Sequence, residues 1–542
     1  MNKLSTESLT EQIANQVIQH KETIPSKKSY LQLSNLFEQL EQPKKAVNVL
    51  HEGLQVYPTS IQLHQALWTL YTKRKAKKEK ILHLPRTLKR RFVKRPIIFF
   101  DQLQNTLLKN NQLETFLSIS KMQLQQNPQQ IELQNKVIQH LLSIGQFEEA
   151  IPYLETLKTL EKNPKQLVKI NMQIGMVNML FGHFDEAEKY FSYCQKEFAD
   201  ILPEIYPNSY EKLVIFNNGE SSIEFYKYIY PTKHVVATFD AIDKTDSGKP
   251  FAFKVLKKKA VDLISLRRGH MQNYHQDISR EEYFQAIEKL VPFYEKRFAY
   301  GTSLGGYNAL FLGSMIPDCQ ILSFAPRNPA HPIYGTKERK YTKFVHPVSH
   351  PINKEIQPII CFDPKDTIDN PYTTKEIMQS YPNGIYKHFD YAGHRVPTYL
   401  RETGELKEIV SSFLEEKPFP DYDHKLRSKS AEYHRVLGIH CRRHNKLRWA
   451  LELANKSIEI APKYDRSLAL RIEILLKLKQ FDECITYANE AIQLHPKSAR
   501  FYILLADAYK GKGNTNKAVE VLESASKKVQ SIKLKEKLAT LK

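Results

Sequence analysis

The residues most suited to chemistry form a glycine-framed turn around a serine. The segment FAYGTSLGGYNALFLG begins as an apolar strand, turns through Gly301-Thr302-Ser303-Leu304-Gly305 and continues as a helix. This is the G-x-S-x-G pattern of a nucleophile elbow, with the strand before it and the helix after it that the elbow requires. A Cβ at Gly301 or Gly305 would clash with the backbone crowded into such a turn. We therefore predict that Ser303 is a nucleophile, the alternative being an ordinary glycine-rich strand-to-helix turn.

A serine hydroxyl is a weak nucleophile at neutral pH, so it needs a base, and the base needs an acid that fixes its tautomer. The candidate base is His394, which follows Gly393 in HFDYAGH; the alternative is a loop histidine bonded to backbone. Three candidate acids follow the apolar run PIICF, and they are Asp363, Asp366 and Asp369. Any of these carboxylates could instead cap a helix or stabilise the turn.

Short apolar runs alternate with helical stretches between about residues 206 and 418, and these elements must position the serine and histidine. The predicted strands are LVIFNN, HVVATFD, VDLISL, FAYGTS, QILSFAP, PIICFD and GIYKHFD, and a helix is predicted over ISREEYFQAIEKLVPFYEKR. This alternation predicts a parallel sheet covered on both faces. Ligands bind beyond the carboxyl ends of such strands, so functional residues should follow the strands directly.

Three arginines follow predicted strands at that same edge. Arg267 and Arg268 come after VDLISL, and Arg327 comes after QILSFAP. A guanidinium group at this edge could bind a phosphate or carboxylate of the substrate. We predict that role for all three, with solvated arginines at the rim of the sheet as the alternative.

Helical repeats of about 34 residues occupy both flanks. Pro462 and Pro496 close successive units 34 residues apart, and small residues such as Ala488 and Ala491 stand where two helices would pack closely. Residues 29–60, 131–166 and 167–198 have the same form with less regularity. These segments resemble tetratricopeptide repeats, whose stacked helix pairs present surfaces that bind partners or hold domains in place.

The middle segment resembles the α/β-hydrolase superfamily, in which the triad occurs in the chain order Ser, Asp, His. The superfamily's acid lies three residues past the end of its strand, which implies Asp366, with Asp363 second. Its oxyanion hole implies the backbone N–H of Leu304 and a second N–H from the loop after HVVATF, at Asp240 or Ala241. The HG or HGGG signature of lipases is absent.

Within that superfamily, the sequence is most similar to proteins of bacterial surface-polysaccharide clusters, including capsule O-acetyltransferases. The similarity rests on TFDA, on the elbow GTSLGGYNALFLG, and on FDPKD followed by AGH. It implies that acetyl-CoA acylates Ser303, that His394 acts as base and then acid, and that a sugar hydroxyl accepts the acyl group. Water in place of the sugar would make the same site an esterase.

Charge separates the flanks from the middle. The chain of 542 residues carries a formal net charge of +21, and residues 201–420 contribute only +2 of it. The run from Lys73 to Arg95 is especially basic. We expect the flanks to bind an anionic polysaccharide, capsule-assembly proteins or a membrane surface, unless the run is only a solvated face. Nucleic acid is disfavoured, because no zinc-finger spacing, RNP signature or GxxG clamp accompanies the charge.

Other features exclude several classes of protein. No run approaches the length of an apolar spanning helix and the first thirty residues lack a signal peptide's apolar stretch, so we expect a cytoplasmic protein. Five scattered cysteines without a CxxC pair favour reduced thiols over disulfides or zinc. His346 and His350 have a metal-like interval, but prolines forbid a regular helix there, so no metal is expected. The sequence thus predicts a multidomain protein, with a central α/β-hydrolase-like parallel-sheet domain (206–418) between tetratricopeptide-like repeats (1–205 and 419–542).

The sequence is compatible with three functions. The leading hypothesis is a serine-dependent O-acetyltransferase acting on a bacterial polysaccharide. The second keeps the triad and removes acyl groups as a carbohydrate esterase. The third makes the chain a scaffold whose hydrolase-like domain is inert.

Overall fold

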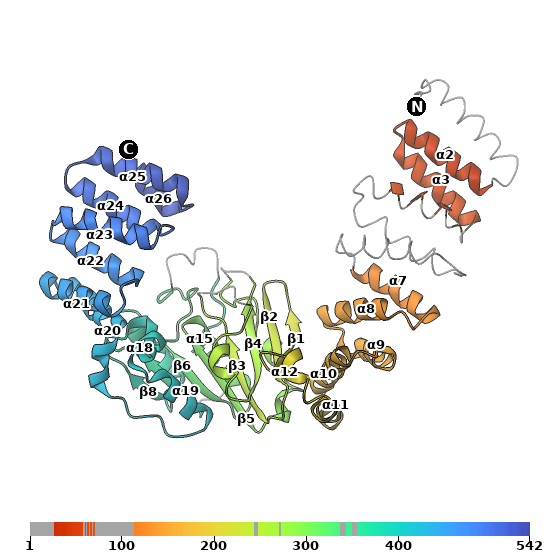
Figure 1. The fold of residues 1–542 in the computed structure, drawn as a ribbon, viewed down its shortest axis with the longest axis horizontal. Helices are drawn as coiled ribbons and strands as arrows, with labels where there is room; N and C mark the ends of the chain where they lie inside the picture. Colours follow the sequence, from red (N-terminus) through yellow and green to blue (C-terminus); the bar gives the residue numbers. More distant parts are fainter. Residues whose placement is uncertain are drawn as a thin grey trace. The chain divides into compact units, whose positions relative to one another are not determined.

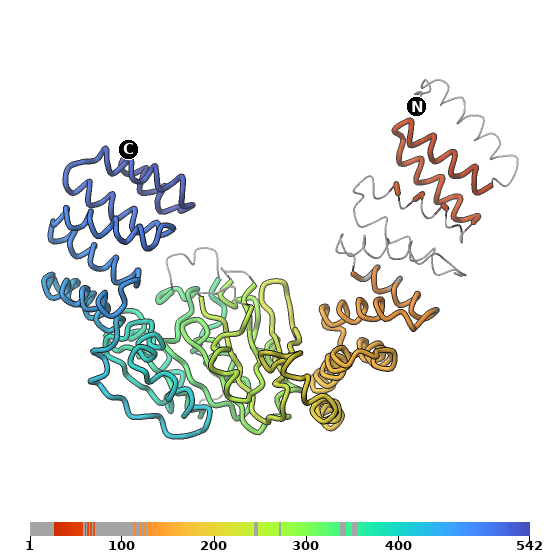
Figure 2. Tube along the Cα trace, in the orientation of Figure 1, coloured from red at the N-terminus to blue at the C-terminus, as the bar shows by residue number. Residues whose placement is uncertain are grey.

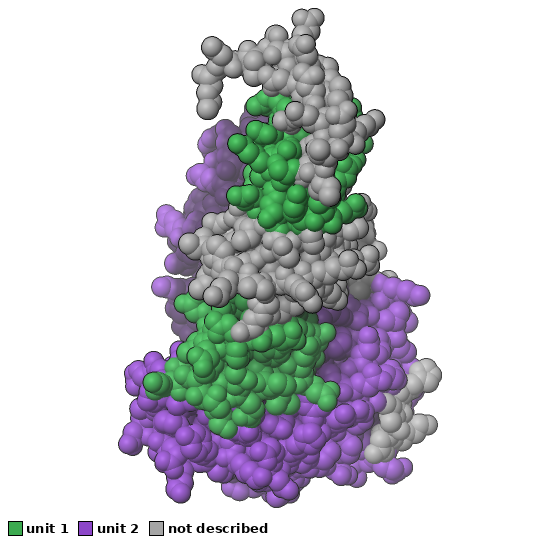
Figure 3. Space-filling view, turned by 90° about the vertical axis from the view of Figure 1, so that its right-hand side faces the viewer, with its two compact units in different colours: residues 1–162 green, residues 163–542 purple. Residues whose placement is uncertain are grey.

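A computed structural model describes residues 26–57, 60, 62–63, 66–67, 69–70, 113–242, 248–269, 273–335, 343–349 and 355–542 (Figure 1). The basic run from Lys73 to Arg95 and the histidine at position 350 lie outside these residues. The chain divides into two compact units, residues 1–162 and 163–542, which Figure 3 distinguishes by colour.

The first unit consists of helices in its described residues. Their bounds are α2 (Lys27–Gln39), α3 (Pro43–Val56), α7 (Leu113–Gln126), α8 (Ile131–Ser143) and α9 (Phe147–Leu160). The pairs α2–α3 and α8–α9 are the helical hairpins predicted for residues 29–60 and 131–166. Gly53 shows why a small residue is needed between paired helices, because a Cβ there would lie 2.7 Å from Cγ of Tyr30.

An eight-stranded mixed sheet forms the centre of the second unit (Figure 1). Its strands are β1 (Tyr210–Asn217), β2 (Ser221–Tyr228), β3 (His234–Phe239), β4 (Asp262–Arg268), β5 (Lys296–Thr302), β6 (Gln320–Phe324), β7 (Ile359–Phe362) and β8 (Ile385–His388). The strand order is β1-β2-β4-β3-β5-β6-β7-β8. The six strands from β4 to β8 are parallel, so their carboxyl ends meet at one edge.

The sheet and its connections differ from the sequence-based expectations in three ways. The sheet is mixed, because β1 and β2 form an antiparallel hairpin and β2 pairs antiparallel with β4. Strand β2, which reads SSIEFYKY, was not predicted, since polar residues interrupt its apolar positions. The long helix expected after β4 is only α14 (Arg280–Gln285), followed by a 3-10 turn that contains Pro292.

In the sequence of the second unit, helices precede the first strand, connect several of the strands and follow the last strand. Those before β1 are α10 (Pro164–Leu180), α11 (Phe184–Glu197) and α12 (Leu202–Ile205). Within and after the sheet lie α13 (Phe253–Leu256), α15 (Leu304–Phe311), α16 (Asp369–Tyr372), α17 (Met378–Ser380), α18 (Val396–Thr403) and α19 (Leu406–Leu414). Phe298 of β5 packs edge-on against Phe413 of α19, so α19 covers one face of the sheet.

The carboxyl-terminal helices form successive hairpins (Figure 2). They are α20 (Ala431–Arg443), α21 (Leu447–Ile460), α22 (Asp465–Lys477), α23 (Phe481–Leu494), α24 (Ala499–Gly511), α25 (Thr515–Lys528) and α26 (Ile532–Ala539). Ala488 and Ala491 are completely buried between helices, as the repeat pattern predicts. The sheet and these hairpins belong to the same compact unit.

Contacts between α20 and the end of the sheet domain are specific. The Glu402 carboxylate of α18 accepts hydrogen bonds from the Ser430 hydroxyl at 2.6 Å and from the Glu432 N–H at 2.9 Å. A Cβ added at Gly393 would lie 2.9 Å from Cγ2 of Val436 in α20. The first carboxyl-terminal hairpin therefore lies directly against the loop that carries His394.

Candidate active site

Ser303 occupies a strained turn between β5 and α15. Its backbone has φ 55° and ψ −120°, in a region that a residue with a side chain rarely adopts. The flanking glycines permit this turn, because a Cβ at Gly301 would lie 2.1 Å from the carbonyl oxygen of Gly305, and one at Gly305 would lie 2.4 Å from that of Phe239. Both distances are far below van der Waals contact. The elbow predicted from sequence is thus present with the crowding that its glycines imply.

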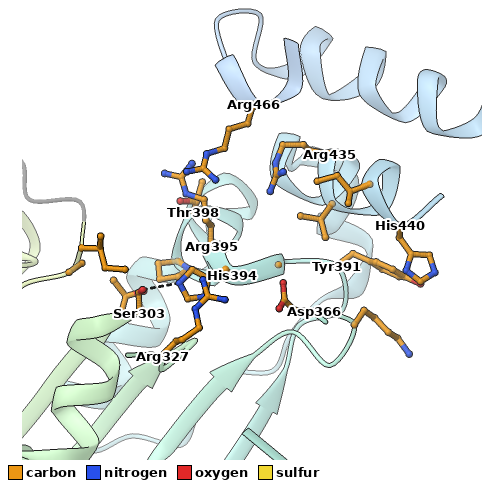
Figure 4. A pocket seen from close by; sticks show the side chains of 18 of the residues that line it. Ser303, Arg327, Asp366, Tyr391, His394, Arg395, Thr398, Arg435, His440 and Arg466 are labelled. Atoms are coloured by element: carbon orange, nitrogen blue, oxygen red, sulfur yellow. Dashed lines mark hydrogen bonds between the residues drawn. The ribbon is translucent and has the colours of Figure 1, made fainter. Parts of the chain in front are cut away.

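His394 faces the serine from the loop after β8 (Figure 4). Its Nε2 lies 2.8 Å from Oγ of Ser303, within hydrogen-bond distance. The histidine lies in a short 3-10 turn, Gly393–Arg395, and Gly393 adopts φ 60°. The imidazole retains 24% side-chain exposure and lines the cavity beside Ser303.

The carboxylate beside His394 belongs to Asp369, and the expectation for Asp366 was wrong. Oδ2 of Asp369 lies 2.6 Å from Nδ1 of His394, and the Asp369 side chain is 1% exposed. Oδ1 of Asp366 instead accepts the backbone N–H groups of Ile368 and Asp369, each at 2.9 Å. Asp366 therefore stabilises the turn that leads into α16, and Asp369, the first residue of α16, points at the histidine.

Asp363 anchors the two loops that meet at the site. Its buried carboxylate accepts backbone N–H groups of Lys365 at 2.8 Å, Tyr391 at 3.1 Å and Gly393 at 2.8 Å. Burial raises the pKa of Asp363 to about 6, although these three donors favour the ionised form. Asp363 thereby fixes the loop of His394 to the loop of Asp369 through backbone hydrogen bonds.

Two backbone N–H groups are suited to an oxyanion hole. Leu304 is the first residue of α15, and its N–H has no intrahelical acceptor at that position. In the described part of the chain, the Ala241 N–H likewise donates to no other group, and both Ala241 and Ser303 line the same cavity. The alternative donor, Asp240, is excluded because its N–H donates to the Leu266 carbonyl at 3.0 Å.

Arg267 and Arg268 are buried supports of that loop, so the expectation that they rim the pocket was wrong. Strand β4 continues through both residues, which pair with β2. Nε of Arg267 donates to the Asp240 carboxylate at 3.1 Å. Arg268, which is 1% exposed, donates to the carbonyls of Ala241 and Ile242, each at 3.3 Å. Both guanidinium groups therefore hold in place the loop that follows β3.

Arg327 lies in the pocket, as the sequence suggested, but it also has a protein partner. Its guanidinium lies 3.1 Å from Oδ1 of Asp369, while the other carboxylate oxygen faces His394. The backbone N–H of Arg327 donates to the carbonyl of Ser303 at 3.1 Å. Arg327 thus connects the turn of Ser303 to Asp369, the carboxylate beside His394.

The serine and histidine open onto a cavity of about 480 Å³. Its inner wall comes from the loops after β3, β5, β6, β7 and β8, and its outer wall comes from α20 and the start of α22. The residues that the sequence analysis missed are Arg395, Arg435, Val436, His440, Arg443 and Arg466. Arg395 directly follows His394, so its place in the sequence could have indicated it. No local signal identifies the other five, because they join the site only through packing of the repeats against the His394 loop.

Among the described residues, no group of three or more His, Cys, Asp or Glu side chains is placed to hold a metal ion. No helix in the described ranges has the length and apolar character needed to cross a bilayer.

In comparisons with known proteins, one family model matches a part of the chain. Residues 475–541 match the tetratricopeptide repeat, so the carboxyl-terminal flank contains repeats of this type. None of the curated proteins matches the sequence. Among solved structures, Est1E from Butyrivibrio proteoclasticus is 13% identical, with a TM-score of 0.27 and coverage of 38% of this chain and 99% of its own. Yeast Tom70 is 10% identical, with a TM-score of 0.21 and coverage of 95% and 94%. TM-scores this low do not establish a shared fold with either protein.

Proposed function

We propose that this protein is a cytoplasmic serine-dependent O-acetyltransferase that transfers an acetyl group from acetyl-CoA to a hydroxyl of a bacterial capsular or surface polysaccharide. The observation that carries the proposal is the continuous chain from Ser303 Oγ through His394 to Asp369, at 2.8 Å and 2.6 Å. The site also has two unused N–H donors beside the serine. The proposal includes membership of residues 206–418 in the α/β-hydrolase superfamily, which the order Ser, Asp, His and the elbow favour.

The first half of the reaction would form an acyl-enzyme. His394 Nε2 accepts the proton of the Ser303 hydroxyl as Oγ attacks the thioester carbonyl carbon. The former carbonyl oxygen becomes negatively charged in the tetrahedral intermediate, and it accepts hydrogen bonds from the backbone N–H groups of Ala241 and Leu304. Removing one such donor typically costs about 10²–10³ in kcat. Collapse expels the thiolate, which takes the proton from the imidazolium, while Asp369 stabilises that cation.

The second half would use the same groups in reverse. His394 accepts the proton of an acceptor hydroxyl as its oxygen attacks the acetyl carbonyl on Ser303. The same two N–H groups stabilise the second tetrahedral intermediate. The Ser303 oxygen then leaves and recovers the proton from His394. The products are an O-acetylated sugar and the free enzyme, and no metal or redox cofactor takes part in this scheme.

A carbohydrate esterase is the second candidate, favoured by the exposure of the histidine. With 24% of its side chain accessible, His394 could equally activate a water molecule against the acyl-enzyme. Every group in the scheme keeps its role, and only the acceptor changes. The identity of the acceptor therefore decides between transfer and hydrolysis.

The helical repeats would serve the same function by binding partners. Stacked helix pairs generally present extended binding surfaces, and the carboxyl-terminal flank contains tetratricopeptide repeats. We propose that these surfaces bind the anionic polymer or proteins of the capsule-assembly machinery. Activity assays should use the full chain with its repeats, because α20 forms one wall of the cavity.

Acetyl transfer predicts strong stimulation by the acceptor. Consumption of acetyl-CoA should rise at least about tenfold when a suitable surface polysaccharide is added, since tenfold corresponds to only about 1.4 kcal/mol of barrier. Thiol release measures the rate, and acetate on the glycan identifies the product. The Ser303→Ala variant gives the uncatalysed background. Equal rates with and without all acceptors, together with free acetate as the product, would favour the esterase.

A further inference from the structure

Arginines from three separate parts of the second unit surround the mouth of the cavity. We call the set the arginine wall, and its members are Arg395, Arg435, Arg443 and Arg466. Arg395 follows the histidine of the site, Arg435 and Arg443 lie on α20, and Arg466 lies in the first turn of α22. In Figure 4 the side chains of Arg395 and Arg466 extend toward one another on the same side of His394.

Buried groups hold part of this wall in a fixed arrangement. Glu432 is completely buried, and its carboxylate receives Nε of Arg435 at 2.8 Å and NH2 of Arg435 at 2.6 Å. The hydroxyl of Tyr464 donates to the same carboxylate at 2.6 Å and accepts from Arg395 at 3.0 Å. Burial alone would raise the pKa of Glu432, but these hydrogen bonds and the nearby arginines hold it below its ordinary value.

Basic side chains outnumber acidic ones among the described residues that line the cavity. Glu432 is one carboxylate facing two guanidinium groups, those of Arg395 and Arg435. Arg443 and Arg466 are exposed, and the partner of Arg443 is an uncharged one, the Thr367 hydroxyl at 3.3 Å. Among the described residues that line the cavity, Asp366 is the only carboxylate. The mouth of the cavity is therefore strongly cationic.

We infer that the arginine wall is a phosphate-binding subsite, which seats a phosphate ester or phosphodiester of the substrate while the acyl carbon lies at Ser303. Arginine forks match the oxygens of phosphate in pairs. A phosphate monoester, which approaches two negative charges near neutral pH, also gains about twice the Coulomb attraction of a carboxylate from each guanidinium, whereas a phosphodiester carries one charge and relies on the paired hydrogen bonds. This inference rests on the proposed function and names the chemistry of its substrate.

The phosphate could belong to either substrate, and the two sources can be separated. The acyl donor would supply it as the phosphates of CoA. The acceptor would supply it as phosphodiesters of an anionic polymer. Binding is measured by calorimetry on the full chain with Ser303→Ala, so that no turnover interferes. The donor arm compares CoA with pantetheine, which lacks the phosphates, and the acceptor arm compares poly(glycerol phosphate) with uncharged dextran.

The informative variants change the exposed members of the wall. Arg466→Gln should weaken binding of the phosphate-bearing ligand about tenfold, and Arg443→Gln with Arg466→Gln about a hundredfold, since each charge-assisted contact is worth about a factor of ten. Both side chains are exposed, so the melting temperature should stay constant. Arg448→Gln is the matched control, because Arg448 is an exposed arginine of the neighbouring α21 outside the cavity.

A loss confined to CoA assigns the phosphate to the donor, and a loss confined to poly(glycerol phosphate) assigns it to the acceptor. The inference is overturned if neither ligand responds to the double variant, or if Arg448→Gln causes an equal loss, which would indicate bulk charge alone. These binding results do not depend on catalysis. A wall that binds phosphate in a protein with an unreactive Ser303 would contradict the proposed function alone.

Discussion

The Ser303→Ala variant should lose essentially all turnover while keeping its fold. Removing the nucleophile of a hydrogen-bonded triad costs on the order of 10⁶ in kcat. Alanine at this position loses one hydroxyl, whose partner is His394, and leaves the backbone and core of the turn unchanged. Initial rates of acetyl-CoA consumption with the acceptor measure the loss. Retention of more than about one per cent of the activity would exclude a covalent mechanism through Ser303.

The histidine provides an internal check on that result. His394→Ala should reduce kcat by a comparable factor. Combining it with Ser303→Ala should reduce kcat little further, because the loss of one member of a triad already removes the contribution of the others. Losses that multiply would indicate that the two side chains work independently. Equal melting temperatures for all three variants would establish that activity, rather than folding, has changed.

Asp369→Asn should reduce kcat by about 10⁴, the loss expected when an amide replaces the acid that fixes the histidine tautomer. An amide cannot accept and stabilise the imidazolium proton as a carboxylate does, although it fills the same volume. Arg327, which faces the other carboxylate oxygen at 3.1 Å, would lose its ionic partner as well. The reaction rate at saturating substrate is the measurement.

Asp366→Asn is the matched control for this substitution. The Asp366 carboxylate serves the backbone N–H groups of residues 368 and 369, and an asparagine oxygen can accept the same hydrogen bonds. We expect it to retain activity within about a factor of ten, since exposed turn hydrogen bonds contribute only about 1 kcal/mol. A larger loss from Asp366→Asn than from Asp369→Asn would contradict the assignment of the acid.

Features that depend on local geometry were predictable from the sequence. Glycines two residues either side of Ser303 have one physical explanation, which is a turn too crowded for a Cβ, and the structure shows that crowding. The helix pairs of the flanks follow from apolar spacing and buried small residues. The proximity of Leu304 to the loop after β3 follows from β3 and β5 being neighbours in the sheet.

Features that depend on the path of a loop were not predictable. Three carboxylates occur within seven residues, and only the folded loop shows that Asp363 accepts backbone N–H groups, Asp366 stabilises a turn and Asp369 reaches His394. Arg267 and Arg268 appeared to follow a strand because the hairpin partner β2 was missed. Pairing with β2 extends β4 through both arginines and buries them.

The arginine wall was not predictable from the sequence either, because its members come from separate segments that meet only in the folded chain. Arg435 and Arg466 fall in segments with helical-repeat patterns, where a basic residue ordinarily indicates a solvated helix face. Their position at the cavity results from Gly393 allowing α20 to approach and from Glu402 binding the start of α20. The separation of charged flanks from a near-neutral middle was therefore misleading, since the carboxyl-terminal flank supplies a wall of the candidate site.

The reactivity of Ser303 toward a fluorophosphonate probe tests the central claim most directly. The purified full chain would be treated with the probe and digested, and the peptide carrying the adduct would be identified by mass spectrometry. An activated serine predicts a single adduct on Ser303, absent in Ser303→Ala and much slower to form in His394→Ala. An intact protein that forms no adduct at Ser303, or is modified only at other residues, would contradict the claim and favour a scaffold with an inert hydrolase-like domain.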